Sequence, residues 1–128
     1  MNQGLNKNER LKSRKDTELL FSEGTALYLF PFKLVYKWMD TETQECNVKI
    51  LVSVPKRKFK TAVDRNFLKR RIKEAYRTNK SELEIGTLGK SLSLAIIYTH
   101  HEIRDFNDLQ KRLILILRKL NLQLHSHK

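Results

Sequence analysis

Residues 52–77 read VSVPKRKFKTAVDRNFLKRRIKEAYR, and the change of pattern within them decides how the chain folds. Val52 and Val54 end a run with the two-residue period of a β-strand, and Pro55 closes it because proline donates no backbone hydrogen bond. Thr61 is a typical helix N-cap, and no glycine or proline interrupts residues 62–79. The stretch therefore predicts a strand that leads through a short basic turn into a long helix.

The predicted helix has two unlike faces. At about 100° per residue, Leu68, Ile72 and Ala75 fall on one side, where they can face a core. Cations and one asparagine fall within an arc of about 140° on the other side, namely Arg65, Asn66, Lys69, Arg70, Lys73, Arg77 and Lys80. Like charges at this spacing repel each other by a few tenths of a kcal/mol per pair, so a fold with no use for them would intersperse acids. This face predicts a polyanionic partner.

Patterns on either side of this stretch predict the remaining elements. Ser13, with Asp16 following it, resembles a helix cap, and Gly24 is a typical helix stop. In chain order we expect a helix at 14–23, a short strand near 27–30, strands at 32–39 and 48–54, the basic helix at 62–79, a strand at 91–99 and a last helix from 105. This α-β-β-β-α-β-α order predicts an α/β fold, a two-layer sandwich with a central sheet.

Length and composition indicate one domain, residues 1–128, with an excess of positive charge. Lys and Arg number 26 against 14 Asp and Glu, which gives a net charge of +12. Residues 56–80 hold eleven basic and two acidic side chains, and residues 1–16 hold five and two, so the excess lies in these segments. We expect residues 1–12 to form a mobile basic arm. The polar start and the shortness of every apolar run lead us to expect a cytoplasmic protein.

The cationic helix fits more than one partner on these grounds. A helix of this kind can enter the major groove of DNA, whereas A-form RNA would be gripped through its phosphates, loops and shape. A structural RNA-binding protein of the ribosomal type, which only neutralises folded RNA, would carry the same helix. A lipid surface is a weaker match, because the helix lacks the broad apolar face that membrane-bound helices bury. The residues alone favour a polynucleotide and leave its kind open.

Candidates for catalysis or metal binding are few. His100 and His101 follow a predicted strand and are expected to be surface histidines. The lone cysteine, Cys46, cannot form an intramolecular disulfide and has no base near it in sequence. Nuclease chemistry carried by a protein needs clustered carboxylates or a nucleophile with its base, and neither pattern is present in the sequence. We therefore expect no catalytic residue and no metal site in this chain.

The stretch 52–77 resembles the signature of the bacterial ribonuclease P protein subunit, in which a strand ending in V-S precedes an A-V dipeptide and the pattern R-N-x-x-K-R-x-x-R/K-E. Arg10-Leu11-Lys12, Phe21 and Gly24-Thr25 match the opening pattern of that family. The resemblance implies the family's fold, which is ribosomal protein S5 domain 2-like. It also implies a left-handed βαβ crossover, against the right-handed rule.

The resemblance further implies a function. Ribonuclease P of this kind is an RNA-based enzyme that removes the 5′ leader from precursor tRNA. Its active site lies on the RNA subunit, and the holoenzyme uses Mg²⁺, so the protein would be an accessory without catalytic residues of its own. The implied partners are the ribonuclease P RNA and precursor tRNA, with no membrane and no small-molecule substrate.

Two sets of residues follow from the same resemblance. The helix that carries R-N, with its flanks, would bind the RNA subunit through Lys56, Arg57, Arg65, Asn66, Lys69, Arg70, Lys73 and Arg77. A cleft between the first helix and the sheet would bind the single-stranded leader through Phe21, Phe32, Tyr36 and Ser53, because aromatic rings stack on any base. A strand register shifted by one residue would exchange Tyr36 for Val35 in this cleft.

Overall fold

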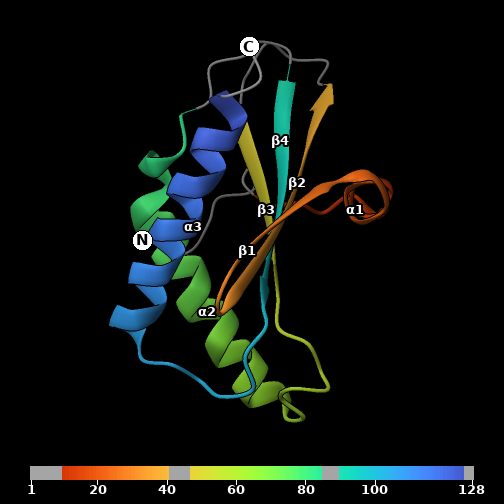
Figure 1. Ribbon diagram of the computed structural model, residues 1–128. Coiled ribbons are helices and arrows are strands. Elements are labelled where there is room, and N and C mark those ends of the chain that lie inside the picture. The colour runs from red at the N-terminus through yellow and green to blue at the C-terminus, as the bar shows by residue number, and fades with distance from the viewer. Residues whose placement is uncertain (1–9, 41–46, 85–89, 126–128) are drawn as a thin grey trace, which may run out of the picture.

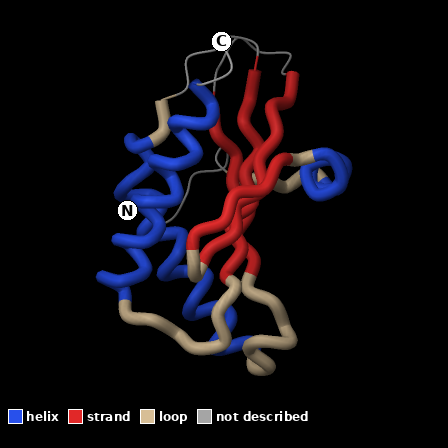
Figure 2. Tube along the Cα trace, viewed as in Figure 1, coloured by secondary structure: helices blue, strands red, loops and turns tan. Residues whose placement is uncertain are grey.

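The computed structural model describes residues 10–40, 47–84 and 90–125. Its elements are, in chain order, α1 (Arg14–Glu23), β1 (Thr25–Leu29), β2 (Phe32–Asp40), β3 (Asn47–Ser53), α2 (Ala62–Asn79), the short 3₁₀ helix η2 (Lys80–Glu82), β4 (Lys90–Tyr98) and α3 (Phe106–His125). Figure 2 shows the strands grouped into one sheet with helices on both sides. The predicted order of elements is confirmed, and each predicted boundary lies within a few residues of the observed one.

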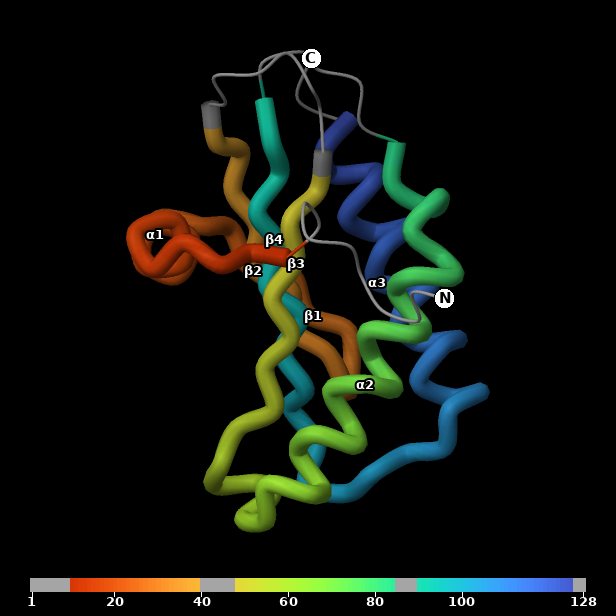
Figure 3. Tube along the Cα trace, turned by 180° about the vertical axis from the view of Figure 1, so that it is seen from behind, coloured from red at the N-terminus to blue at the C-terminus, as the bar shows by residue number. Residues whose placement is uncertain are grey.

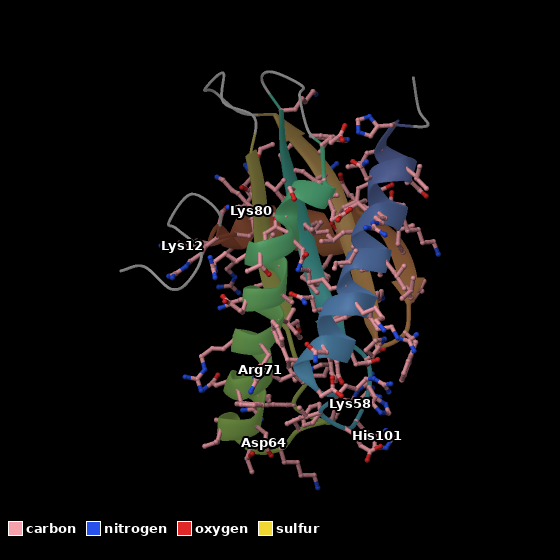
Figure 4. All side chains as sticks on the ribbon, turned by 90° about the vertical axis from the view of Figure 1, so that its left-hand side faces the viewer. Lys12, Lys58, Asp64, Arg71, Lys80 and His101 are labelled. Carbon is pink, nitrogen blue, oxygen red and sulfur yellow. The ribbon has the colours of Figure 1, made fainter. Side chains whose placement is uncertain are left out.

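The four strands form one sheet in the order β1-β2-β4-β3. β2 pairs antiparallel with both β1 and β4, and β3 pairs parallel with β4. Two adjacent parallel strands need a crossover, and α2 provides it. Viewed from the side of α2 and α3, with β3 and β4 running downward, the chain passes from β3 on the left to β4 on its right (Figure 4). The β3-α2-β4 crossover is therefore left-handed, in contrast to the usual rule.

The main core lies between the sheet and the pair α2 and α3, which lie side by side on one face (Figure 1). The strand residues of this core alternate along each strand, as they do for Leu92, Leu94 and Ile96 of β4. α3 meets them with Leu109, Leu113, Ile116, Leu117 and Leu120, all fully buried. The spacing of these residues gives the helix one broad apolar face, and this face fixes it on the sheet.

The opposite face of the sheet carries α1, which stands apart from the other two helices (Figure 3). A second, smaller core forms here from Leu11, Leu20, Val35 and Ala95. Gly24 ends α1 with φ −75°, so it is not required for a left-handed backbone. It is required for space, because a Cβ at this position would lie 2.3 Å from Leu20 O and 2.7 Å from a methyl carbon of Val35.

The predicted basic arm, residues 1–12, is only partly described. Residues 1–9 lie outside the described residues. Mobility is the wrong expectation for its last part, because Leu11 is buried and its backbone N–H donates to Ile50 O at 2.9 Å. Arg10 also forms a parallel bridge with Ile50. The chain is therefore fixed along the edge of β3 before α1 begins.

Candidate nucleic-acid interface

α2 is built as a helix with one buried and one cationic side. The Thr61 hydroxyl caps its start by accepting a hydrogen bond from the Asp64 N–H at 3.3 Å. Leu68, Ile72 and Ala75 are fully buried against the sheet and α3, as predicted. Asn66 and Arg70 are exposed on the other side, and Lys69 and Lys73 are half-buried beside them. The helix thus presents a row of polar and basic groups that its core contacts hold in a fixed register.

A group of like charges lies where α2 meets the segment before α1. Burial lowers the pKa of the Lys73 ammonium, and the like charges of Arg10 and Lys69 lower it further. Arg10 reaches this position because Leu11 is anchored on β3. Among the described residues, no carboxylate lies within ion-pair distance of Arg10, Lys69 or Lys73. These cations repel each other in the free protein, and a bound anion would relieve that repulsion.

Arg65 has a structural contact that the sequence did not reveal. Its Nη1 donates to two backbone oxygens of the preceding turn, Phe59 O at 2.7 Å and Lys60 O at 3.0 Å. The guanidinium therefore ties the basic turn to the first turns of α2. Lys56 and Arg57 of the same turn are exposed. Arg65 holds their segment of backbone against the helix.

Arg77 is the predicted site residue whose charge is most fully compensated. Its Nε and Nη2 both donate to the Glu74 carboxylate at 2.8 Å. These hydrogen bonds lower the pKa of the Glu74 carboxyl and raise that of Arg77. A phosphate would have to compete with this carboxylate, so Arg77 is a weaker candidate than Arg70 or Lys69.

Two of the predicted leader residues lie on the wrong face for their predicted cleft. Phe32 and Tyr36 are 1% and 8% exposed and belong to the main core under α2 and α3, not to the face that carries α1. Val35 takes the position under α1, which is the register shifted by one residue. Both faces of β2 are covered by helices, and its large aromatic side chains are buried in the larger core.

Phe21 and Ser53 both belong to the side of the sheet that carries α1. Phe21 is 48% exposed on α1. Ser53 is half-buried, and it alternates with Val52 of the main core, so its side chain lies on the α1 face of the sheet. Its neighbour across the parallel pair is Ile97, which packs against the α1 core. The exposed ring is on α1, which packs over β2 and β4, and the serine is on β3 at the edge of the same face.

Arg10 and Arg71 are two cations near α2 that lie outside the predicted set of binding residues. Arg71 falls outside the cationic arc of the helix, and its guanidinium lies 4.8 Å from the ring centroid of Phe67 and 5.7 Å from that of Phe106. Figure 4 shows Arg71 on the outer side of α2 and Lys12 at the β3 side of the same helix. The sequence signal for Arg71 was an aromatic side chain four positions earlier on the same helix.

Groups suited to hold a metal are not found in the part of the chain that the structure describes, where no three His, Cys, Asp or Glu side chains come together. His100 and His101 lie 3.7 and 3.8 Å from one oxygen of Glu102, and their ring centroids are 4.6 Å apart. Cys46 lies outside the described residues. No helix within the described ranges is long and apolar enough to cross a membrane.

Fold and site together define a basic α/β sandwich protein whose crossover helix carries an exposed cationic face. The family model for ribonuclease P matches residues 5–121. The chain belongs to the ribonuclease P protein family, the protein components of an endoribonuclease of tRNA processing.

Relatives and solved structures agree with this assignment. The ribonuclease P protein component of Porphyromonas gingivalis is 34% identical over 110 residues, which cover 84% of this chain and 80% of that protein. The RNase P protein from Thermotoga maritima superposes with a TM-score of 0.68 at 26% identity, over 87% of this chain and 96% of that one. The Staphylococcus aureus RNase P protein shares the fold, with a TM-score of 0.65 at 20% identity over 88% of this chain and 94% of that one.

Proposed function

We propose that this chain binds the catalytic RNA subunit of ribonuclease P through the cationic side of α2. The observation that carries the proposal is the group formed by Arg10, Lys69 and Lys73, three like charges held together with no acidic partner among the described residues. Arg70 and Asn66 extend this group along the exposed side of the helix. A guanidinium matches the fork of a phosphate, and an amide can hydrogen-bond a base or ribose edge.

The α1 face of the sheet is proposed to bind the single-stranded 5′ leader of precursor tRNA. Phe21 supports this role because an exposed ring can stack on any base, and Ser53 adds a hydroxyl on the same face. Phe32 and Tyr36 are not proposed to stack on the leader, because both are buried in the main core. One aromatic platform predicts modest affinity and little base preference.

The chemistry is proposed to belong to the RNA subunit and its Mg²⁺ ions. The described residues of the protein bring together no set of carboxylates that would hold such an ion. The protein's own contribution is to neutralise phosphates and to hold the leader so that the cleavage site stays in place. This role makes the chain an accessory subunit in the removal of the leader.

A cleavage assay tests the proposal. The isolated protein should not cut RNA, and adding it to its cognate RNA subunit at low Mg²⁺ should raise the cleavage rate of precursor tRNA. The stimulation should be larger for a substrate with a leader several nucleotides long than for a leaderless one. A structural RNA-binding protein of the ribosomal type would give no stimulation. Equal help to both substrates would show that the α1 face does not bind the leader.

Phe21→Ala separates the two proposed surfaces, and Phe30→Ala is its matched control. The two rings are 48% and 50% exposed, but Phe30 lies in the turn between β1 and β2. Phe21→Ala should weaken leader-dependent substrate affinity by about 5-fold or more, the lower range of one lost stacked base, while leaving affinity for the RNA subunit intact. Equal losses in both affinities would instead identify Phe21 as a structural residue.

A further inference from the structure

A hollow of about 370 Å³ lies on α2 beyond the cationic side, where the start of α3 meets it. It is lined by Phe67, Arg70, Arg71 and Glu74 of α2 and by Phe106 of α3. A second hollow of about 330 Å³ shares Phe67, Arg71 and Phe106 and extends toward Ile103. The rings of Phe67 and Phe106 and the guanidinium of Arg71 therefore lie between two adjoining hollows.

The apolar side chains of this surface are unusually exposed for a helical face. Phe67 is 38% exposed, and Val63, one turn earlier on α2, is more exposed still. Ile103 contributes a third exposed apolar side chain from the segment before α3. Large apolar groups that gather at one place and stay in water mark a binding surface more often than scattered single ones do.

Arg71 is held by the rings rather than by an acid. Its guanidinium lies over Phe67 and Phe106 at 4.8 and 5.7 Å, and among the described residues no carboxylate is within ion-pair distance of it. Glu74, which lines the same hollow, has both oxygens bonded to Arg77. The N–H groups of Arg71 therefore remain available, and the planar group is already oriented for stacking.

We propose that this surface binds one unpaired nucleotide of the ribonuclease P RNA, with the base stacked against Phe67 and Arg71 and its phosphate on Arg70. The inference rests on the proposed function and extends it to a second contact on the same helix. Charge argues for this occupant: within the described ranges neither Arg70 nor Arg71 has an acidic partner, which favours an anion, and the two rings favour a flat apolar group. An unpaired nucleotide has both, whereas an acidic peptide would leave the rings uncovered.

Position argues for the RNA subunit as the source of this nucleotide. At about 100° per residue, Arg70 lies at the border between the cationic side of α2 and the sector that holds Phe67 and Arg71. An RNA bound along the cationic side therefore reaches the hollow without leaving the helix. The α1 face, proposed for the leader, lies on the opposite side of the sheet (Figure 1).

Phe67→Leu and Arg71→Lys test the proposal, with Tyr28→Leu as matched control. Tyr28 is also an exposed ring under a cation, with Lys33 Nζ 5.4 Å from its centroid, but it lies on β1. Phe67→Leu should weaken binding of the RNA subunit by about 5-fold or more, as expected for a lost base stack, and Phe67→Trp should restore it. Arg71→Lys keeps the charge but loses the planar stack, so it should also weaken binding. Tyr28→Leu should have no effect.

Filter binding of the labelled RNA subunit over a range of salt concentrations measures these affinities, and thermal melts of the free variants show that each is folded. The slope of log affinity against log salt should be unchanged in Phe67→Leu, because no phosphate contact is removed. Unchanged affinity for the RNA subunit in both Phe67→Leu and Arg71→Lys would overturn the inference. So would a loss of affinity that these variants show only for precursor tRNA or only for an acidic peptide. Failure of the unaltered chain to bind the RNA subunit would overturn the proposed function instead.

Discussion

Replacing Arg65 by alanine separates two tasks that the structure gives to one guanidinium. The side chain lies on the cationic side of α2, where it can contact RNA, and it also donates to Phe59 O and Lys60 O at 2.7 and 3.0 Å. Arg70 lies five residues further along the helix and is exposed, and among the described residues its side chain has no such backbone contact. Arg65→Ala should therefore reduce both stability and RNA binding, and Arg70→Ala should reduce RNA binding alone.

The expected loss of stability follows from the two hydrogen bonds. A hydrogen bond from a charged group contributes about 1.5 to 3 kcal/mol when it is well protected. The bond to Lys60 O is exposed to water, so we expect Arg65→Ala to lower the free energy of unfolding by about 1 to 2 kcal/mol in total. An exposed substitution such as Arg70→Ala should stay within about 0.5 kcal/mol. Loss of one charged contact to phosphate should weaken RNA binding in each variant by about 1 to 3 kcal/mol.

Urea unfolding followed by circular dichroism measures the first quantity, and filter binding of the RNA subunit measures the second. Arg65→Lys serves as the intermediate variant, because an ammonium keeps the charge but ends one bond short of the Nη1 that donates to both oxygens. The reasoning is refuted if Arg65→Ala and Arg70→Ala unfold with the same free energy. It is also refuted if Arg65→Ala is destabilised but binds RNA as the unaltered chain does.

Three further predictions concern other parts of the fold. Lys73→Gln should leave the free protein equally or slightly more stable in urea, because the ammonium is partly desolvated and repelled by its neighbours. The same change should weaken RNA binding by about 10-fold, because one charged contact is lost. A hydrogen bond from Arg104 holds the pKa of the Asp108 carboxyl below its ordinary value of 3.8. The pair therefore stabilises the fold above that pH, and this stabilisation is lost as the pH falls through the folded-state pKa. Asp108→Asn should flatten this acid dependence in thermal melts. Gly24→Ala should lower the thermal midpoint and cost about 1 to 3 kcal/mol, since its Cβ would meet Leu20 O, and an unchanged midpoint would mean that α1 is not seated as described.

Much of the fold could be predicted because its signals are local. The hydroxyl of Thr61 marks the start of α2, and the missing backbone N–H of Pro55 marks the end of β3. The spacing of Leu68 and Ile72 indicates the buried side of the helix. The cationic side then follows by geometry. The left-handed crossover was expected only from family resemblance, because no local pattern records handedness.

The leader face could not be predicted correctly in the same way. Alternation along β2 divides its residues into an apolar set that includes Phe32 and Tyr36 and a mixed set that includes Val35 and two lysines. The structure buries the first set in the main core and places Val35 under α1. Phe32 and Tyr36 were assigned to the α1 face from the family resemblance, although an apolar stripe of this kind is typical of a core. The position of Arg10 beside Lys73 depends on how distant segments of the chain meet, and the contact of Arg65 depends on the path of the turn just before α2.

The dependence of RNA-subunit affinity on salt tests the central claim most directly. Arg10, Lys69, Arg70 and Lys73 lie together without acidic partners among the described residues, and each phosphate contact contributes about 0.9 to the slope of log affinity against log salt. The unaltered chain should therefore show a slope of about −4 or steeper, and joint replacement of Lys69, Arg70 and Lys73 by glutamine should reduce it by about 3. A slope near zero, or one that this replacement leaves unchanged, would contradict the assignment of α2 as the RNA-binding helix.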